Sequence, residues 1–281
     1  TLSLHDALPI FLLAIPVSAQ VRAQPQPEGW PFGLRWVQLI SVGLNNYPPW
    51  LLRGPLVTTA HGTSSQTIAD FALACVLQHA LRLSDRRVRS PEGWRHVSAP
   101  ALAGSTLGLF GFGGIGRALA AKALALGLRV RALRASRVPL GMDGVEAARD
   151  LADLLATSDH LALVAPGTDA TRHVINAASL AHARPGLHLI NVSRGSLVEQ
   201  TDLVAALDSG QLAYASLDVT EPEPLPAGHA LYTHPRVYLS SHTCAISPQV
   251  RAAVLEKFLR GLATWESGGT PDDPVDFGRG Y

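Results

Sequence analysis

Apolar runs of strand length alternate with segments of helical periodicity along most of the chain after residue 104. The pattern predicts strands at residues 106–110, 128–133, 160–165, 187–192, 213–219 and 237–240. It predicts a helix that starts at Arg117 and further helices over residues 147–156, 176–183, 201–210 and 247–268. Strands that alternate with helices form a parallel sheet covered on both faces, so the fold class is predicted to be α/β, with a doubly wound (Rossmann) sheet.

The first third of the chain carries a weaker form of this pattern. Apolar runs at 11–17, 34–40 and 55–59 predict short strands, and residues 23–33, rich in proline and glycine, predict a loop. Helical periodicity over residues 65–83 then leads into the larger sheet. The chain is therefore predicted to form two α/β domains, and the smaller one joins the N-terminal third to the closing helix.

A glycine motif lies between the strand at 106–110 and the helix that follows it. Gly111, Gly113 and Gly116 have G-x-G-x-x-G spacing, with Gly114 and Ile115 between them. The first glycine allows a tight turn, the second lets a pyrophosphate approach the backbone, and the third lets helix and strand pack closely. Free N–H groups at the helix N-terminus attract the phosphates. Because the strand and helix that the motif requires are both present, it predicts a dinucleotide site.

The end of the second strand indicates which dinucleotide is bound. An acidic residue there would accept the ribose 2′-OH of NAD, but this chain has Arg134, Ser136 and Arg137. Two guanidinium groups favour a 2′-phosphate, so the predicted cofactor is NADP, with NAD as the alternative. The competing interpretation is that these arginines are ordinary surface charges.

Chemically capable side chains follow three later strands. Arg194 follows the strand at 187–192, Glu223 follows 213–219, and His242 follows 237–240. Ligands bind beyond the carboxyl ends of the strands in such sheets, so these positions predict a cation, an acid and a proton donor at one edge. Taken singly, each has an ordinary alternative: a salt-bridge arginine, a surface acid and a core histidine.

With these residues the chain resembles the D-isomer-specific 2-hydroxyacid dehydrogenases from about residue 11 to its end. The matching segments are Gly111–Gly116, Pro166-Gly167-Thr168 through Thr171-Arg172, Ile190–Gly195, Leu217-Asp218-Val219 with Glu223-Pro224, and Ser241-His242. The resemblance implies hydride transfer between the C4 atom of a nicotinamide and the C2 atom of a small 2-oxoacid or D-2-hydroxyacid.

The resemblance also assigns roles to residues. Arg194 would bind the substrate carboxylate and polarise its 2-oxo group, His242 would be the acid and base, and Glu223 would orient and charge His242. The backbone near Val42 and Gly43 would hold the carboxylate from the other domain. Cofactor contacts are expected at the glycine motif and the arginine loop, and at Pro166, Thr171, Val192, Ser193, Asp218 and His242. The implied domains are a partial substrate domain at 1–63, a cofactor domain at 64–246 and a returning segment at 247–281.

Several features depart from the family. Ser241 stands where the family usually has proline, Asp70 where glutamate is usual, and Arg134 where aspartate is usual. The chain starts with Thr1 and has fewer N-terminal residues than family members, so we expect the first strand and helix of the substrate domain to be missing. Residues 1–10 resemble a translated sequencing adapter. The apolar run at 8–17 resembles a signal peptide, but no basic residue precedes it and two prolines interrupt it.

Composition and charge limit the partners and the cellular compartment expected for this protein. A net charge of +1 with 47% apolar residues gives no indication of nucleic-acid binding, and the arginines at 82, 86, 87, 89 and 95 fit a solvated helix end and loop. Cys75 and Cys244 have no disulfide or metal-ligand spacing, so a reducing, cytoplasmic setting and no metal are expected. No segment is long enough to span a membrane. The helix at 65–83 resembles the family's dimer element, so a homodimer is expected.

Two other functions share this scaffold. One is an NAD(H)-sensing co-repressor-like binding protein that does not turn over substrate. The other is a dehydrogenase of a different small anion, such as formate or phosphite. The sequence does not identify the 2-oxoacid, because the pocket for the substrate side chain is formed by loops.

Overall fold

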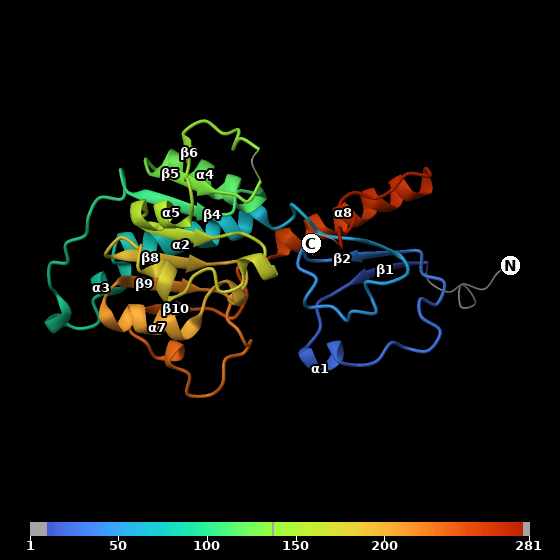
Figure 1. Ribbon diagram of the computed structural model, residues 1–281, viewed down its shortest axis with the longest axis horizontal. Helices are drawn as coiled ribbons and strands as arrows, with labels where there is room; N and C mark the ends of the chain where they lie inside the picture. The colour runs from blue at the N-terminus through green and yellow to red at the C-terminus, as the bar shows by residue number, and fades with distance from the viewer. Residues whose placement is uncertain (1–9, 137, 278–281) are drawn as a thin grey trace. The chain divides into compact units, whose positions relative to one another are not determined.

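The computed structural model describes residues 10–136 and 138–277. The chain divides into two compact units, a smaller one of residues 1–63 with 246–281 and a larger one of residues 64–245. Figure 1 labels their elements. The two units are described separately below.

Within the described residues, the larger unit contains a seven-stranded sheet in the order β10-β9-β8-β7-β4-β5-β6 (Figure 1). All neighbouring strands are parallel. The strands are β4 (Thr106–Phe110), β5 (Arg129–Leu133), β6 (Val145–Ala147), β7 (His160–Leu163), β8 (Leu187–Asn191), β9 (Leu212–Leu217) and β10 (Val237–Leu239). The predicted doubly wound α/β fold is therefore confirmed.

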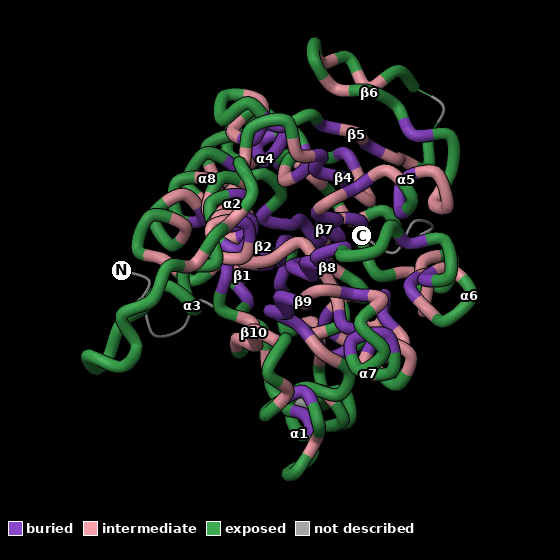
Figure 2. Tube along the Cα trace, turned by 90° about the vertical axis from the view of Figure 1, so that its left-hand side faces the viewer, coloured by how far each residue is buried: buried purple, intermediate pink, exposed green. Residues whose placement is uncertain are grey.

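Helices cover both faces of this sheet. On one face, α2 (Ser65–Ala80) and α4 (Gly114–Ala125) share a core with β4 and β5. On the other, α5 (Leu151–Thr157), α6 (Ala177–Leu180) and α7 (Gln200–Ser209) share a core with β7, β8 and β9. Because both faces are covered, β7 and β8 are buried along their whole length and appear purple in Figure 2.

The order of the strands creates a switch point beside the glycine motif. The chain runs outward from β4 through β5 to β6, returns, and continues from β7 to β10 on the other side of β4. Leu163, Asn191, Leu217 and Leu239 are paired in register across β7, β8, β9 and β10, so these four strands end at one edge. A switch point is where open α/β sheets bind ligands, beyond the carboxyl ends of the strands.

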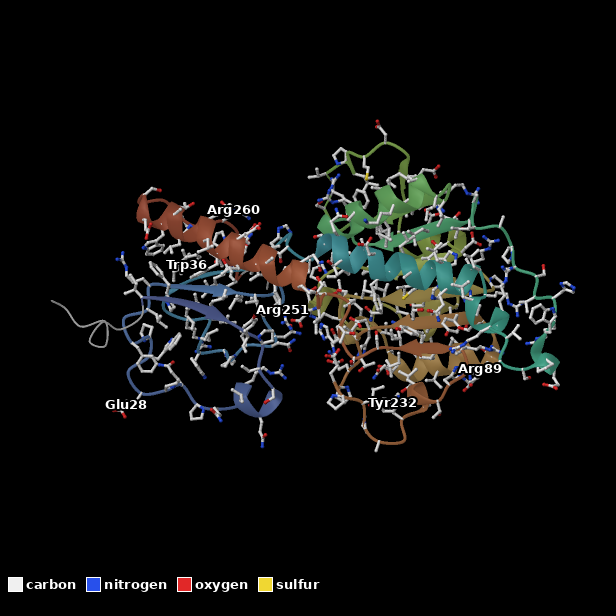
Figure 3. The ribbon with its side chains drawn as sticks, turned by 180° about the vertical axis from the view of Figure 1, so that it is seen from behind. Glu28, Trp36, Arg89, Tyr232, Arg251 and Arg260 are labelled. Carbon is white, nitrogen blue, oxygen red and sulfur yellow. The ribbon has the colours of Figure 1, made fainter. Side chains whose placement is uncertain are left out.

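The smaller unit contains a parallel sheet in the order β1-β2-β3, formed by β1 (Phe11–Ala14), β2 (Trp36–Leu39) and β3 (Leu56–Thr58). The short helix α1 (Ala19–Arg22) and the long closing helix α8 (Pro248–Glu266) belong to the same unit. The ring of Trp36 lies between β2 and α8, where it stacks on Phe258 with centroids 5.1 Å apart (Figure 3). The indole N–H of Trp36 donates to Thr58 Oγ1 at 2.8 Å.

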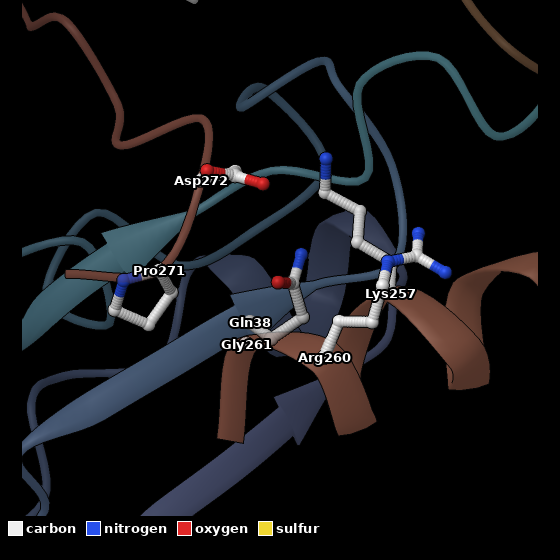
Figure 4. A pocket seen from close by; sticks show the side chains of 6 residues that line it. All are labelled: Gln38, Lys257, Arg260, Gly261, Pro271 and Asp272. Carbon is white, nitrogen blue, oxygen red and sulfur yellow. The ribbon is translucent and has the colours of Figure 1, made fainter. Parts of the chain in front are cut away.

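The smaller unit also encloses a cavity of about 30 Å³. Figure 4 shows it between α8, β2 and the segment after α8, and its lining is Gln38, Lys257, Arg260, Gly261, Pro271 and Asp272. A cavity of this size holds about one water molecule and cannot hold a cofactor. The Lys257 ammonium pairs with Asp273 and donates to the carbonyl oxygen of His61, so it already has partners.

The structure corrects several predicted boundaries. Helix α4 begins at Gly114 instead of Arg117, and α2 ends at Ala80 because Arg82 adopts a left-handed backbone with φ of 50°. Residues 145–147 form the edge strand β6, and α5 begins only after Asp150, whose side chain accepts from the Asp153 amide at 2.8 Å. The remaining short helices are α3 (Leu83–Arg86) and the 3₁₀ turns Pro91–Gly93, Asp169–Thr171, Gly195–Leu197 and Ala230–Tyr232. In the part of the chain that the structure describes, no helix has the length and apolar character needed to cross a membrane.

Candidate active site

The glycine turn lies against the end of β7. Gly111 has a φ of +106°, and a Cβ atom there would lie 2.6 Å from the amide nitrogen of Ala165, so only glycine fits. A Cβ atom at Gly113 would meet nothing within 4 Å, and Gly113 is exposed. The turn therefore leaves open space in front of the N-terminus of α4, and the residues present fit a bound pyrophosphate.

The loop after β5 contains the predicted arginines. Arg134 is half-buried and Ser136 is exposed, whereas Arg137 lies outside the described residues. Arg117, in the first turn of α4, donates to the carbonyl oxygens of Leu140 at 2.6 Å and Gly141 at 3.3 Å. These two hydrogen bonds hold the N-terminal end of α4 against the loop that follows Arg134.

The segment after β7 closes on itself beside this turn. Thr171 Oγ1 donates to the carbonyl oxygen of Pro166 at 2.8 Å and accepts from the Thr168 amide at 2.8 Å. A capping box at Thr168 and Thr171 completes the turn. Pro166 and Thr171, both predicted to contact the cofactor, therefore belong to one ordered loop at the switch point.

The segment after β8 is shaped by Asn191. Its amide nitrogen donates to the carbonyl oxygen of Arg194 at 2.8 Å, and its amide oxygen accepts from the Ser193 backbone at 3.1 Å. Val192 is buried, and the Ser193 hydroxyl donates to the carbonyl oxygen of Ala165. Burial lowers the pKa of Arg194, while the charge of Glu223 raises it. An arginine remains protonated under such conditions, so a positive charge lies beyond β8.

Glu223 and His242 form an ion pair beyond β9 and β10. His242 Nδ1 lies 2.8 Å from Glu223 Oε2, and the two side chains are 35% and 38% exposed. The other carboxylate oxygen accepts from the Thr220 amide at 3.1 Å. Burial alone would raise the pKa of Glu223, but the hydrogen bond and charge of His242 outweigh it, so this pKa lies below its ordinary value. With Nδ1 engaged, Nε2 is the ring nitrogen left to act on a substrate.

Asp218 binds the segment that carries His242. Its carboxylate is 1% exposed and accepts from Ser240 Oγ at 2.6 Å, the Thr243 amide at 3.0 Å and the Cys244 amide at 3.1 Å. These contacts fix the segment that carries His242. The predicted contact between Asp218 and the cofactor stays a prediction, because the carboxylate is engaged within the protein.

The larger unit thus brings Arg194, Glu223 and His242 to one edge of the sheet, as the strand-end argument predicts. Val42 and Gly43 lie after β2 in the smaller unit, and their contact with a substrate stays a prediction.

Among the described residues, no group of three or more His, Cys, Asp or Glu side chains is arranged to hold a metal ion. Burial raises the pKa of Cys75 to about 11, so it does not supply a thiolate at neutral pH.

Sequence reasoning missed one part of the site. Arg172 lies just beyond the closed loop at 166–171. Its guanidinium donates from Nη1 to Glu221 Oε1 at 3.1 Å, and its Nη2 lies 3.0 Å from Oε2 of the same carboxylate. These residues are 49 positions apart. No motif or periodicity connects them, so only the fold shows the pair.

A family model matches most of the larger unit. Residues 71–244 match the model described as D-isomer specific 2-hydroxyacid dehydrogenase, NAD binding domain. A glyoxylate/hydroxypyruvate reductase A of Serratia proteamaculans is 34% identical over 241 residues, covering 84% of this chain and 75% of that protein.

Two solved structures are also similar. An NADPH-dependent glyoxylate/hydroxypyruvate reductase of Sinorhizobium meliloti, in complex with NADP and sulfate, has a TM-score of 0.78 at 29% identity and covers 89% of this chain and 81% of its own. A D-isomer specific 2-hydroxyacid dehydrogenase of Xanthobacter autotrophicus, in complex with NADPH and MES, has a TM-score of 0.76 at 32% identity, with coverage of 91% and 82%.

Proposed function

The chain belongs to the D-isomer-specific 2-hydroxyacid dehydrogenases, and we propose that this member uses NADPH to reduce a small 2-oxoacid such as glyoxylate or hydroxypyruvate. As a family member it is an oxidoreductase that transfers hydride between a nicotinamide cofactor and a small 2-oxoacid or D-2-hydroxyacid. The observation that carries the proposal is the placement of Arg194 and the His242–Glu223 pair beyond adjacent strands of one sheet.

Each of these side chains has a distinct task. Arg194 presents a forked set of donors that suits a carboxylate and the neighbouring 2-oxo oxygen. His242 delivers a proton from Nε2 to that oxygen during reduction and takes it back during oxidation. Glu223, held at Nδ1 of His242, fixes the ring orientation and stabilises the protonated ring.

The cofactor supplies the hydride, and this chain's residues would hold it by its phosphates and its ribose. The turn from Gly111 to Gly116 would take the pyrophosphate, and Arg134 with Ser136 would take a 2′-phosphate. The preference for NADPH is supported by Arg134, a half-buried cation that directly follows β5. It is also supported by the two structural relatives whose complexes contain NADP or NADPH.

A panel assay tests the proposal. Oxidation of NADPH and of NADH is followed with glyoxylate, hydroxypyruvate, pyruvate and phenylpyruvate, with the His242→Ala variant as the control. Turnover of at least one 2-oxoacid by the unmodified protein, lost in the variant, is expected. Tight cofactor binding without turnover of any substrate would favour the co-repressor-like alternative, and oxidation of formate or phosphite alone would favour the other dehydrogenases.

We also propose that the protein is a cytoplasmic homodimer that binds neither nucleic acid nor membranes. The segment between α2 and β4 exposes Trp94 (82%), Leu83 (50%) and Val88 (43%), which are large apolar side chains that a second subunit would cover. Its arginines at 82, 86, 87, 89 and 95 are exposed, and Arg89 is labelled in Figure 3. Light scattering of the unmodified protein and of Trp94→Ser tests the dimer, which is expected to dissociate in the variant.

A further inference from the structure

Glu221 is held on several sides. Its carboxylate pairs with both Nη atoms of Arg172, at 3.1 and 3.0 Å. Its backbone carbonyl oxygen accepts from the side-chain amide of Gln200 at the start of α7, and its amide lies 3.5 Å from the same side chain. His173 lies between Glu199 and Glu221, with ring nitrogens 3.1 and 3.8 Å from the two carboxylates.

The same segment is fixed to the loop that carries Arg194. A Cβ atom at Gly195 would lie 2.0 Å from the carbonyl carbon of Thr220 and 2.6 Å from the amide nitrogen of Glu221. The backbone after β8 therefore packs directly on the backbone after β9, and only glycine permits this approach. Any shift of Glu221 would move against the segment that positions Arg194.

Glu221 is also two residues from the acid of the ion pair. Thr220 donates through its amide to Glu223 Oε1 at 3.1 Å and through its hydroxyl to the carbonyl oxygen of Pro222 at 2.9 Å. Residues 220–223 therefore form one small turn. Contacts that hold Glu221 therefore also hold the Glu223 carboxylate, which is bound to His242.

We propose that Arg172 is a positioning residue for catalysis: through Glu221 it holds the 220–223 turn so that Glu223 stays bound to His242. This inference rests on the proposed function, in which His242 is the proton donor. It also gives Arg172 a connecting role, because Arg172 directly follows the closed loop at 166–171, where the cofactor is expected to bind. The Arg172–Glu221 pair, with His173 Nε2 3.8 Å from the same carboxylate, joins the loop on the cofactor side to the acid–base loop.

The experiment compares three variants with the unmodified protein. Arg172→Met removes the pair, Arg172→Lys keeps the charge but loses the fork, and the exchange Arg172→Glu with Glu221→Arg restores the pair in reverse. The pair is about half exposed, and such pairs are worth about 1 kcal/mol at most, which corresponds to about a fivefold fall in kcat for Arg172→Met. The Kd for NADPH, measured by fluorescence titration, is expected to stay within about twofold, because Arg172 acts on the proton donor. Arg172→Lys and the exchange are expected to recover most of the lost kcat.

Arg184→Met is the matched control. Arg184 pairs with Asp159 at 2.6 Å, with 48% exposure against 51% for Arg172, but Asp159 lies before β7, at the opposite edge of the sheet. Loss of this pair, whose arginine is about as exposed as Arg172, is expected to leave kcat unchanged. An equal fall in kcat for both variants would mean that any surface pair has this effect, and the proposal would be wrong.

Hydrogen exchange separates this proposal from the proposed function. In Arg172→Met the amide of Thr220 is expected to exchange faster than in the unmodified protein, while amides of β8 and β9 keep their rates. This measurement does not require turnover. Unchanged exchange at Thr220, Glu221 and Glu223 in Arg172→Met overturns the positioning role. If the unmodified protein turns over no 2-oxoacid while these amides exchange faster in Arg172→Met, the proposed function is wrong and the hold of Arg172 on the turn still stands.

Discussion

The backbone amide of His242 donates to the carbonyl oxygen of Asp218 at 2.8 Å, and the Asp218 carboxylate binds the residues on either side of that histidine. His242 has a φ of +56°, a left-handed conformation that a non-glycine residue adopts at a cost of about 1–3 kcal/mol. The contacts with Asp218 compensate this cost. The direction in which His242 points therefore depends on a buried acid from the neighbouring strand.

Asp218→Asn tests this dependence. An amide offers one acceptor oxygen where the carboxylate offers two, so at least one of the donors from Thr243 and Cys244 would be left unpaired. A buried donor without a partner costs about 1–3 kcal/mol, and we expect a lower melting temperature together with a fall in kcat of about tenfold. Thermal unfolding and steady-state kinetics measure the two effects.

Ser240→Ala is the milder companion variant, because it removes one donor to Asp218 and leaves both backbone donors in place. It is expected to retain most of the activity. If Asp218→Asn kept full kcat, the carboxylate would not be what holds His242 in its left-handed conformation.

Replacement within the ion pair separates orientation from proton transfer. His242→Ala removes the proposed proton donor, and kcat is expected to fall by about 10²-fold or more. Glu223→Gln keeps an acceptor for Nδ1 but removes the charge, so its loss should be smaller. Cofactor affinity, measured by fluorescence titration, is expected to change little in Glu223→Gln. Full activity in His242→Ala would show that His242 is not the proton donor.

Local patterns and one topological rule account for much that the sequence predicts. The glycine motif was predictable because its turn chemistry is local, and the strand-end residues were predictable because parallel strands end at one edge. Asn191 could also have been found, because an asparagine that bonds backbone groups two and three residues ahead is a known local motif.

Other features depend on contacts that have no local signal. Strand β6 is three residues long with only Val145 half-buried, so its apolar pattern is too short to distinguish it from a loop. Burial of the Asp218 carboxylate depends on where the segment after β10 folds back, and no local pattern shows this. The pairing of Arg172 with Glu221 depends on two exposed residues in loops that meet only in the folded chain.

Three histidines are gathered on the α2 side of the sheet, at its amino-terminal edge. His160 Nδ1 lies 3.2 Å from His188 Nδ1, and His188 Nε2 lies 2.9 Å from Ser216 Oγ. His79 on α2 packs against the ring of His188 with centroids 4.5 Å apart. Burial, followed by repulsion from His79, lowers the pKa of His160 to about 4 and that of His188 well below its ordinary value.

These shifts predict that acid destabilises the larger unit. The unfolded chain takes up protons on His160 and His188 below about pH 6.5, whereas the folded protein does not, so stability falls as the pH decreases through this range. For His160 alone, the free energy of unfolding should fall by about 2 kcal/mol between pH 7 and pH 5. Urea unfolding at several pH values measures the slope.

Two variants test whether the buried histidines cause the pH dependence of the free energy of unfolding. His160→Leu should make the unfolding free energy less dependent on pH between 5 and 7, whatever its effect on stability at pH 7. His182, which is exposed, is the control, and His182→Gln should leave the slope unchanged. A slope in His160→Leu as steep as in the unmodified protein would show that the acid sensitivity arises elsewhere.

We predict that cofactor preference depends on Arg134, which directly follows β5 and is half-buried. A 2′-phosphate brings about two negative charges to this position, and the guanidinium can bind it but cannot accept a hydrogen bond from a free ribose hydroxyl. One charge-assisted bond is worth about 1.5–3 kcal/mol, so it alone gives about tenfold or more in favour of NADPH, and less at high salt. Arg134→Asp should shift the ratio of kcat/KM values towards NADH.

Arg129→Asp is the control variant. It makes the same change of charge at the opposite end of β5, where the residue is exposed, and should leave the ratio unchanged. Equal use of NADPH and NADH by the unmodified protein would show that Arg134 is an ordinary surface charge.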